Sequence, residues 1–168
     1  MQITSTPLSA AFRRLVVPGF VVLALSSSFS FVPAALFAQA KPRVVEIIGS
    51  DDMKYNTTSI AAKPGEQITI RITAKGTMPA VAMSHNVVVL ALKTDPAAFV
   101  NAGITSRATE YIAPANKAQV LAATKLVANG QTAEVTFKVP AVAGSYPYVC
   151  TFPGHFAAGM KGTLLVKK

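Results

Sequence analysis

Residues 145–167 read SYPYVCTFPGHFAAGMKGTLLVK. The runs Ser145–Thr151 and Gly162–Lys167 have the aromatic and β-branched composition of strands. Between them, Pro-Gly and several small residues favour a tight loop. Such a loop can fold the side chains of Cys150, His155 and Met160 back onto one point beyond the end of a strand. This stretch therefore predicts a β-fold with sulfur and imidazole groups gathered at one end.

Further strand patterns precede this stretch. Gln67–Ala74 alternates between polar and apolar residues after a Pro-Gly turn, and Asn86–Leu92 is a nearly continuous apolar run. Arg43–Ile48 has the composition of a first strand. Thr124–Val127 and Thr132–Val139 flank Ala-Asn-Gly-Gln, so we expect a β-hairpin with Asn-Gly at its turn.

Short strands separated by turn residues, without an internal repeat or a second domain, predict an all-β fold, an antiparallel β-sandwich. Two alanine-rich segments, Asp95–Ala102 and Ala113–Ala122, have helical composition. We expect the excursion Thr94–Val120 to form a short helical flap packed on one sheet.

The first forty residues differ from the rest of the chain. They contain no acidic residue, and Arg13 and Arg14 precede an apolar run, Leu15–Ala38, that ends in Ala-Gln-Ala. This pattern predicts that residues 1–40 form a signal peptide cleaved after Ala40, which leaves residues 41–168 as a periplasmic or otherwise exported domain. The alternative is a retained membrane anchor, because the run is long enough to span a bilayer.

The predicted mature domain has fourteen basic and seven acidic residues, a net charge of +7. Nucleic acid, anionic lipid or an acidic protein could attract such a surface. The basic residues are scattered singly along the sequence, however, and export separates the domain from most nucleic acid. We expect no nucleic-acid partner and a solvated basic surface that tunes encounters with other proteins.

The chain has a single cysteine, Cys150, so an internal disulfide is impossible. A lone thiol in an oxidising compartment is open to oxidation unless something protects it, and metal ligation is one such protection. The two histidines, His85 and His155, complete the His and Cys inventory of the chain. His85 precedes the apolar run Asn86–Leu92, so it reaches the same end if that strand neighbours Ser145–Thr151.

Two imidazoles and a thiolate form a trigonal site, and the Met160 thioether can add a weak axial ligand. This is the ligand set of blue-copper electron-transfer centres. Zinc is the competing metal, but the CxxC spacing of structural zinc sites is absent and methionine is a poor zinc ligand. We therefore predict one copper on His85, Cys150, His155 and Met160.

The sequence resembles the azurins, a cupredoxin family, along nearly all of residues 41–168. Residues 150–155 and 160–164, CTFPGH and MKGTL, are similar to the azurin copper loop. Residues 83–86, 52–56 and the segment 125–137 resemble three further azurin segments. This resemblance implies an eight-stranded Greek-key sandwich with copper at one end, held equatorially by His85, Cys150 and His155 and axially by Met160.

The resemblance also implies that the backbone N–H groups of Asn86 and Phe152 donate to the Cys150 sulfur, and that the Asn86 side chain ties its loop to Thr151.

The sequence departs from azurins in four ways. The spacing from His155 to Met160 is one residue longer, Ser84 replaces a glycine whose carbonyl is a distant ligand, and both the usual disulfide and tryptophan are absent.

The predicted function is that of a monomeric carrier of one electron whose copper cycles between Cu(I) and Cu(II), and not that of an enzyme. We expect the His155 ring edge to reach the surface within an apolar patch, where redox proteins such as c-type cytochromes dock transiently. The patch would comprise Met53, Met78, Pro79, Met83, Pro153, Phe156, Ala157 and Ala158. The alternatives are an exported copper carrier or chaperone and a binding module without metal.

Overall fold

Two β-sheets face each other in the computed structural model, which describes residues 41–168; the predicted signal peptide, residues 1–40, lies outside the described residues. The first sheet has the order β2-β1-β4-β7, with β1 Arg43–Ser50, β2 Lys54–Tyr55, β4 Gln67–Lys75 and β7 Thr132–Lys138. The second has the order β3-β9-β8-β5-β6, with β3 Ser59–Ala62, β9 Lys161–Val166, β8 Gly144–Val149, β5 Val88–Leu90 and β6 Val120–Ala123.

The alternation predicted for β4 sets the core between the sheets. Ile68, Ile70 and Ile72 are fully buried there, where they pack in one cluster with Tyr148 and Leu164 of the facing sheet. The period of two places these isoleucines on one face of the strand. The β-sandwich predicted from the sequence is confirmed.

The strand directions are mixed, which the sequence reasoning did not anticipate. β1 pairs with β4 in parallel, and β3 pairs with β9 in parallel, whereas β4/β7, β5/β8 and β8/β9 are antiparallel. The parallel pairs arise because the chain crosses to the second sheet for β3 before it returns as β4. Such crossings belong to the Greek-key connections that the family resemblance implies.

The predicted hairpin is wrong in its first strand. The strand lies at β6, Val120–Ala123, and pairs with β5, while Thr124–Val127 runs on to hydrogen-bond Val87 and His85. The Asn-Gly turn therefore links the two sheets. The helix expected over Ala113–Ala122 is a 3₁₀ helix, η2 (Pro114–Gln119), that gives way to β6.

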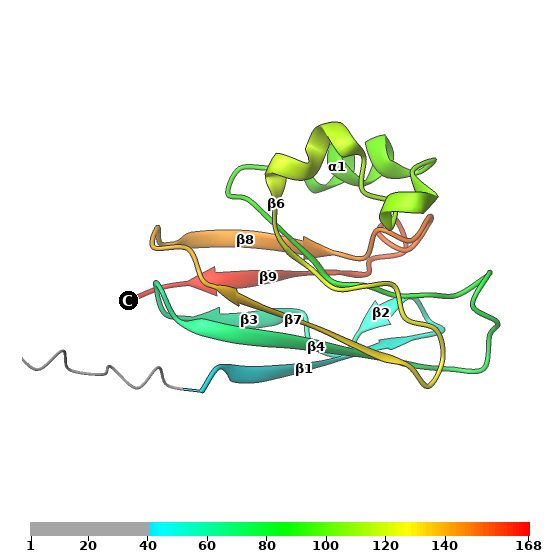
Figure 1. The fold of residues 1–168 in the computed structure, drawn as a ribbon, viewed down its shortest axis with the longest axis horizontal. Coiled ribbons are helices and arrows are strands. Elements are labelled where there is room, and N and C mark those ends of the chain that lie inside the picture. Colours follow the sequence, from blue (N-terminus) through cyan, green and yellow to red (C-terminus); the bar gives the residue numbers. More distant parts are fainter. Residues whose placement is uncertain (1–40) are drawn as a thin grey trace, which may run out of the picture. The chain divides into compact units, whose positions relative to one another are not determined.

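The helical flap is confirmed. Helix α1 (Pro96–Gly103), η1 (Arg107–Thr109) and η2 cover the outer side of the second sheet, with α1 above β8 in Figure 1. Phe99 and Val100 of α1 pack in a second cluster with Val88, Leu90 and Val149. The flap thus buries the apolar side of β5 that faces away from the main core.

No helix within residues 41–168 has both the length and the apolar character needed to cross a membrane.

Candidate metal centre

The pairing of β5 with β8 brings His85 to Cys150. Val88 lies opposite Val149 in this antiparallel pair, so the residues before β5 and those after β8 share one end of the sandwich. The backbone of His85 also forms an isolated bridge with Val127, with N–H···O distances of 2.9 and 2.8 Å in the two directions. The expected proximity of His85 to the strand before Cys150 is confirmed.

The loop between β8 and β9 folds back on itself at the same end, away from the C-terminus (Figure 1). The backbone N–H of His155 donates to Phe152 O at 3.1 Å, and that of Met160 donates to His155 O at 2.9 Å. Gly154 (φ 87°) and Gly159 (φ 99°) adopt the left-handed conformation that these turns require. The loop thereby returns Met160 beside Cys150, whose N–H donates to Met160 O at 3.1 Å.

The side chains meet in a buried cluster, which we call the metal end: His85, Cys150, His155 and Met160. One ligand atom from each of His85, Cys150 and His155 lies within 4.8 Å of the other two. The Cys150 Sγ is 3.5 Å from His155 Nδ1. A methyl group built on Gly49 would lie 2.9 Å from Met160 Cε and 2.8 Å from His85 Cγ, so Met160 borders the same site.

His155 is more deeply buried than expected. Its exposed fraction is 2%, against 1% for His85, so the prediction that its ring edge reaches the surface is wrong. The cause is Phe152, whose ring centroid lies 4.8 Å from that of His155 and is in turn 5.6 Å from the Tyr111 ring of the flap. The imidazole therefore packs against an aromatic ring of its own loop, which in turn packs against the flap.

The residues fit a bound metal ion. Within residues 41–168, His85 Nδ1 is the buried side-chain nitrogen or oxygen without a hydrogen-bond partner. Such orphaned groups are rare in native proteins because burial without a partner is costly. A metal ion at the centre of the cluster would satisfy this atom. A donor set of two imidazoles, a thiolate and a thioether suits copper.

Burial also sets the protonation of the donors. It raises the pKa of the Cys150 thiol to about 11, opposed by the backbone N–H groups of Asn86 and Phe152 and by the Tyr55 hydroxyl. Both backbone donors are those that the family resemblance implies. Burial lowers the pKa of His155 to about 4, helped by the neighbouring His85, and it lowers the pKa of His85 against the opposing effect of Asp51. Both imidazoles are therefore neutral at pH 7 and able to bind a metal.

Asn86 and Thr151 hold the two ligand-bearing segments together, as expected. The Asn86 Nδ2 donates to Thr151 Oγ1 at 2.8 Å, and the Thr151 N–H donates to Asn86 Oδ1 at 2.9 Å. The Thr151 hydroxyl donates to the backbone oxygen of Glu110 at 2.6 Å, and the Glu110 carboxylate accepts from Leu126 N at 2.9 Å. No sequence pattern indicated Glu110, because its role depends on a left-handed backbone (φ 59°) and on the packing of the flap against the loop.

Gly49 is the second residue that sequence reasoning missed. The strand predicted from the sequence stops at Ile48, yet Gly49 is part of β1 and pairs with Ala74 of β4. Any Cβ at this position would press on His85 and Met160 at about 3 Å. The absence of a side chain leaves room for both ligands.

Ser84 occupies its position without crowding. Its side chain is turned away to donate to Ala80 O at 2.8 Å, and its own carbonyl oxygen lies 4.0 Å from Cys150 Sγ. The carbonyl of Ser84 therefore faces the cluster.

The expected apolar patch is only partly on the surface. Met83 is 7% exposed and belongs to the interior, whereas Met78 and Ala157 are exposed and Met53 and Phe156 are half-buried. Val81, which the sequence reasoning omitted, is 73% exposed.

Comparisons with known proteins agree with this site. The model of the family "Copper binding proteins, plastocyanin/azurin family" matches residues 43–167. Azurin from Alcaligenes faecalis is 37% identical over 123 residues, 71% of this chain and 94% of that protein. Azurin from Pseudomonas aeruginosa is 37% identical over 149 residues, 86% and 97% of the two chains. The solved structure of auracyanin A, a "blue" copper protein from Chloroflexus aurantiacus, matches with a TM-score of 0.67 at 32% identity, over 76% of this chain and all of that one. The chain therefore belongs to the plastocyanin/azurin family of copper-binding proteins, as an azurin-like cupredoxin with copper as its cofactor.

Proposed function

We propose that the protein carries single electrons on one type 1 copper held by His85, Cys150 and His155, with Met160 as the axial ligand. The observation that carries this proposal is the convergence of three buried donor side chains, one of which, His85, has an Nδ1 atom without a hydrogen-bond partner. Bound copper would supply the redox chemistry by alternating between Cu(I) and Cu(II).

The chain contributes a rigid and dry environment for that change. His85 precedes β5 and Cys150 follows β8, two paired strands, and Asn86 and Thr151 cross-link the segments that carry them. The donors can therefore move little when the charge of the site changes, which keeps reorganisation small. The N–H groups that face the Cys150 sulfur withdraw electron density from it and so help to set the reduction potential.

The burial of the site favours an electron carrier over the other functions. All four donor side chains are at most 2% exposed, so a substrate has no access to an open coordination position, as an enzyme would require. An exported copper carrier or chaperone would use the same donors but needs an exchangeable site. Burial under Phe152 and the loop disfavours such exchange.

We place the docking of partners at the loop surface above His155. Ala157 of this loop is exposed, as are Met78 and Val81 between β4 and β5, and exposed apolar side chains of this kind fit the small, transient encounters of redox proteins such as c-type cytochromes. The electron would pass through His155 and the overlying Phe152. The predicted signal peptide supports an exported location for a monomeric carrier.

The test is to add Cu(II) to the purified protein and record its visible spectrum. We expect an intense band and a blue colour, which reductant removes and oxidant restores with one electron per copper. Cys150→Ser should be colourless, and Thr132→Ala, an exposed change on the outer face of the first sheet, should remain blue. A colourless wild type that retains zinc would contradict a copper site. Loss of copper to a chelator on each redox cycle would favour the copper carrier.

A further inference from the structure

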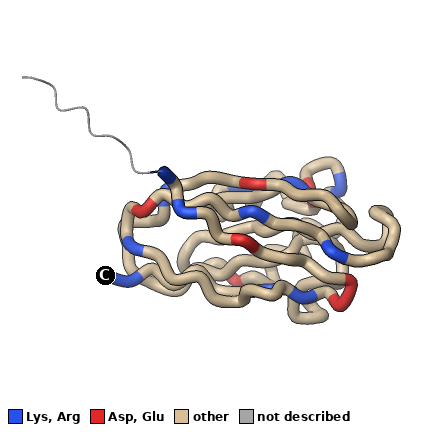
Figure 2. Tube along the Cα trace, turned by 90° about the horizontal axis from the view of Figure 1, so that it is seen from below, with Lys and Arg blue, Asp and Glu red and all other residues tan. Residues whose placement is uncertain are grey.

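The end of the sandwich opposite the metal end is strongly basic. Its basic side chains are all exposed and lie at strand ends: Lys41, Arg43, Lys63, Lys138, Lys167 and Lys168. We call this set, together with Glu66, the basic pole. Figure 2 shows Lys and Arg around the end of the molecule that carries the C-terminus.

The strand pairing explains why residues so far apart in sequence meet. Gln67 at the start of β4 lies opposite Lys138 at the end of β7. In the other sheet Ala62 lies beside Val166, and Lys167 N donates to Ala62 O at 3.1 Å. The Arg43 guanidinium spans the sheets by donating to Ala61 O at 2.8 Å. The scattered basic residues of the sequence are therefore gathered by the fold at one place.

The charge of the domain is concentrated at this pole. Six basic residues and Glu66 give it +5, whereas the eight basic and six acidic residues of the rest of the domain give +2. The Glu66 carboxylate pairs with Arg43 Nε at 2.7 Å and accepts a hydrogen bond from the Lys63 N–H at 2.8 Å. Within residues 41–168, the five lysines of the pole take part in no ion pair.

The shape of the pole suits a broad anionic surface better than one small anion. An open hollow of about 540 Å³ lies between Arg43, Ala61, Lys63 and Lys167. The hollow is open and the lysines beside it are exposed, so their ammonium groups face solvent and do not enclose one small anion. Many separate ammonium groups match an array of phosphate headgroups.

The chain itself indicates which anionic surface this is. The apolar run Leu15–Ala38 joins the domain at Lys41, which belongs to the basic pole. Whether the run is only a transient signal or a lasting anchor, the pole is the part of the domain nearest to the membrane-seeking segment along the chain. We propose that the basic pole docks on a membrane surface of anionic phospholipid, with the metal end turned away from the bilayer. This inference does not depend on the metal or on electron transfer.

The experiment compares two charge-matched variants of the exported protein, purified as the host processes it, so that the N-terminus is the same in both. The pole variant is Lys63→Gln, Lys167→Gln, Lys168→Gln. The control is Lys75→Gln, Arg107→Gln, Lys125→Gln, three exposed positions outside the pole. Binding is measured by co-sedimentation with vesicles of phosphatidylcholine, with and without about one-third phosphatidylglycerol. Far-UV circular dichroism checks that each variant is folded.

We expect the wild type to bind the anionic vesicles and to be released by about 0.5 M salt, because the attraction is screened. The pole variant should bind on the order of a hundredfold more weakly, and the control by less than about fivefold. Equal losses in both variants would overturn the proposal, because net charge alone would then explain binding. Release by millimolar inorganic phosphate at constant ionic strength, or no binding to anionic vesicles, would also overturn it.

Discussion

The two ends of this sandwich are organised by opposite physical rules. At the metal end, four buried side chains are positioned by paired strands and by hydrogen bonds such as that between Asn86 and Thr151. At the basic pole, the lysines are exposed and form no ion pair within the described residues. Short-range packing governs the first end, so single atoms matter there. Long-range charge governs the second, so only the sum matters.

The largest effect should come from the protonation of Cys150. Burial raises the pKa of its thiol to about 11, whereas the lowered pKa of His155, about 4, leaves that imidazole free of protons. Copper binds the thiolate, so binding must release the thiol proton. The apparent affinity for Cu(II) should rise about tenfold per pH unit between roughly pH 6 and pH 9.

Competition titrations with a chelator of known affinity would measure this slope, after correction for the protonation of the chelator. Cys150→Ser should abolish most of it. A wild-type affinity that is flat over this range would show that the thiol is already ionised in the metal-free protein, and so that burial does not govern its pKa.

The next largest effect should follow from removing the amide that joins the ligand segments. Asn86→Ala leaves the buried Thr151 N–H without a partner, and we expect the free energy of unfolding to fall by about 2–4 kcal/mol. The Cys150 segment should also loosen, which would shift and broaden the visible band. Chemical denaturation and absorption spectra measure the two effects.

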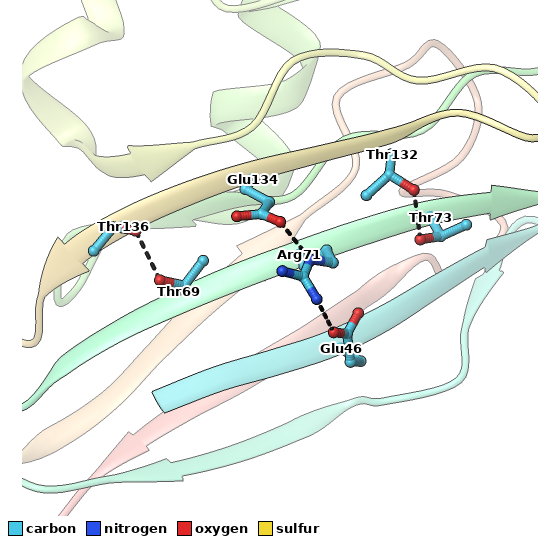
Figure 3. A network of polar contacts seen from close by, with 7 residues as sticks. All are labelled: Glu46, Thr69, Arg71, Thr73, Thr132, Glu134 and Thr136. Atoms are coloured by element: carbon cyan, nitrogen blue, oxygen red, sulfur yellow. Dashed lines mark hydrogen bonds and ion pairs between the residues drawn. The ribbon is translucent and has the colours of Figure 1, made fainter. Parts of the chain in front are cut away.

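The matched control lies on the outer face of the first sheet, away from the core side on which the donors are buried. Figure 3 shows Thr73 and Thr132 paired across β4 and β7, with Oγ atoms 2.9 Å apart, beside Arg71 and its acidic partners. This threonine pair is exposed, so Thr132→Ala should change stability by less than about 1 kcal/mol and leave the spectrum intact. Equal losses for the two variants would mean that burial does not distinguish these hydrogen bonds.

How far the sequence predicts this molecule depends on the range of the interactions. Cys150, His155 and Met160 could be grouped because one short loop contains them. His85 could be added because the chain has no other histidine. The alternation of β4 likewise predicted its buried face, since a period of two is a local property.

Features that depend on long-range packing could not be predicted. The Asn-Gly turn indicated a reversal of the chain, but not that its two flanking segments belong to different sheets. The burial of His155 requires Phe152 to lie against it, and the tie from Thr151 to Glu110 requires the flap to pack on the loop. The basic pole was missed because its lysines become neighbours only through strand register.

A smaller effect should distinguish crowding at the metal end from crowding elsewhere. A Cβ on Gly49 would meet His85 and Met160, while a Cβ on Gly144, at the other end of the sandwich, would meet the Leu92 side chain at 2.9 Å. Overpacking of this kind costs about 1–3 kcal/mol. We expect Gly49→Ala and Gly144→Ala to lose comparable stability, but only Gly49→Ala to change the copper absorption band and the reduction potential. An unchanged spectrum in Gly49→Ala would show that the ligands do not depend on this space.

The smallest effect on stability should come from replacing Glu66. Its ion pair stabilises the fold slightly, whereas its negative charge weakens the attraction of the basic pole to anionic lipid. The Arg43 guanidinium, with the Lys63 N–H, lowers the pKa of Glu66. A lowered pKa means that the carboxylate stabilises the fold above its ordinary pKa and that this contribution disappears as the pH falls through the lowered value. Because the pair is partly exposed to solvent, Glu66→Gln should cost only about 0.5 kcal/mol at pH 7, and nothing near pH 2.

The same substitution raises the charge of the basic pole by one unit, so binding to anionic vesicles should tighten about fivefold. Glu134→Gln provides the control, because it removes an exposed carboxylate that pairs with Arg71 in the middle of the sheet. It should cause a similarly small loss of stability and change vesicle binding by less than about twofold. Glu66→Gln would thus make the domain slightly less stable and yet a better membrane ligand, as expected if the charges of the pole act by their sum.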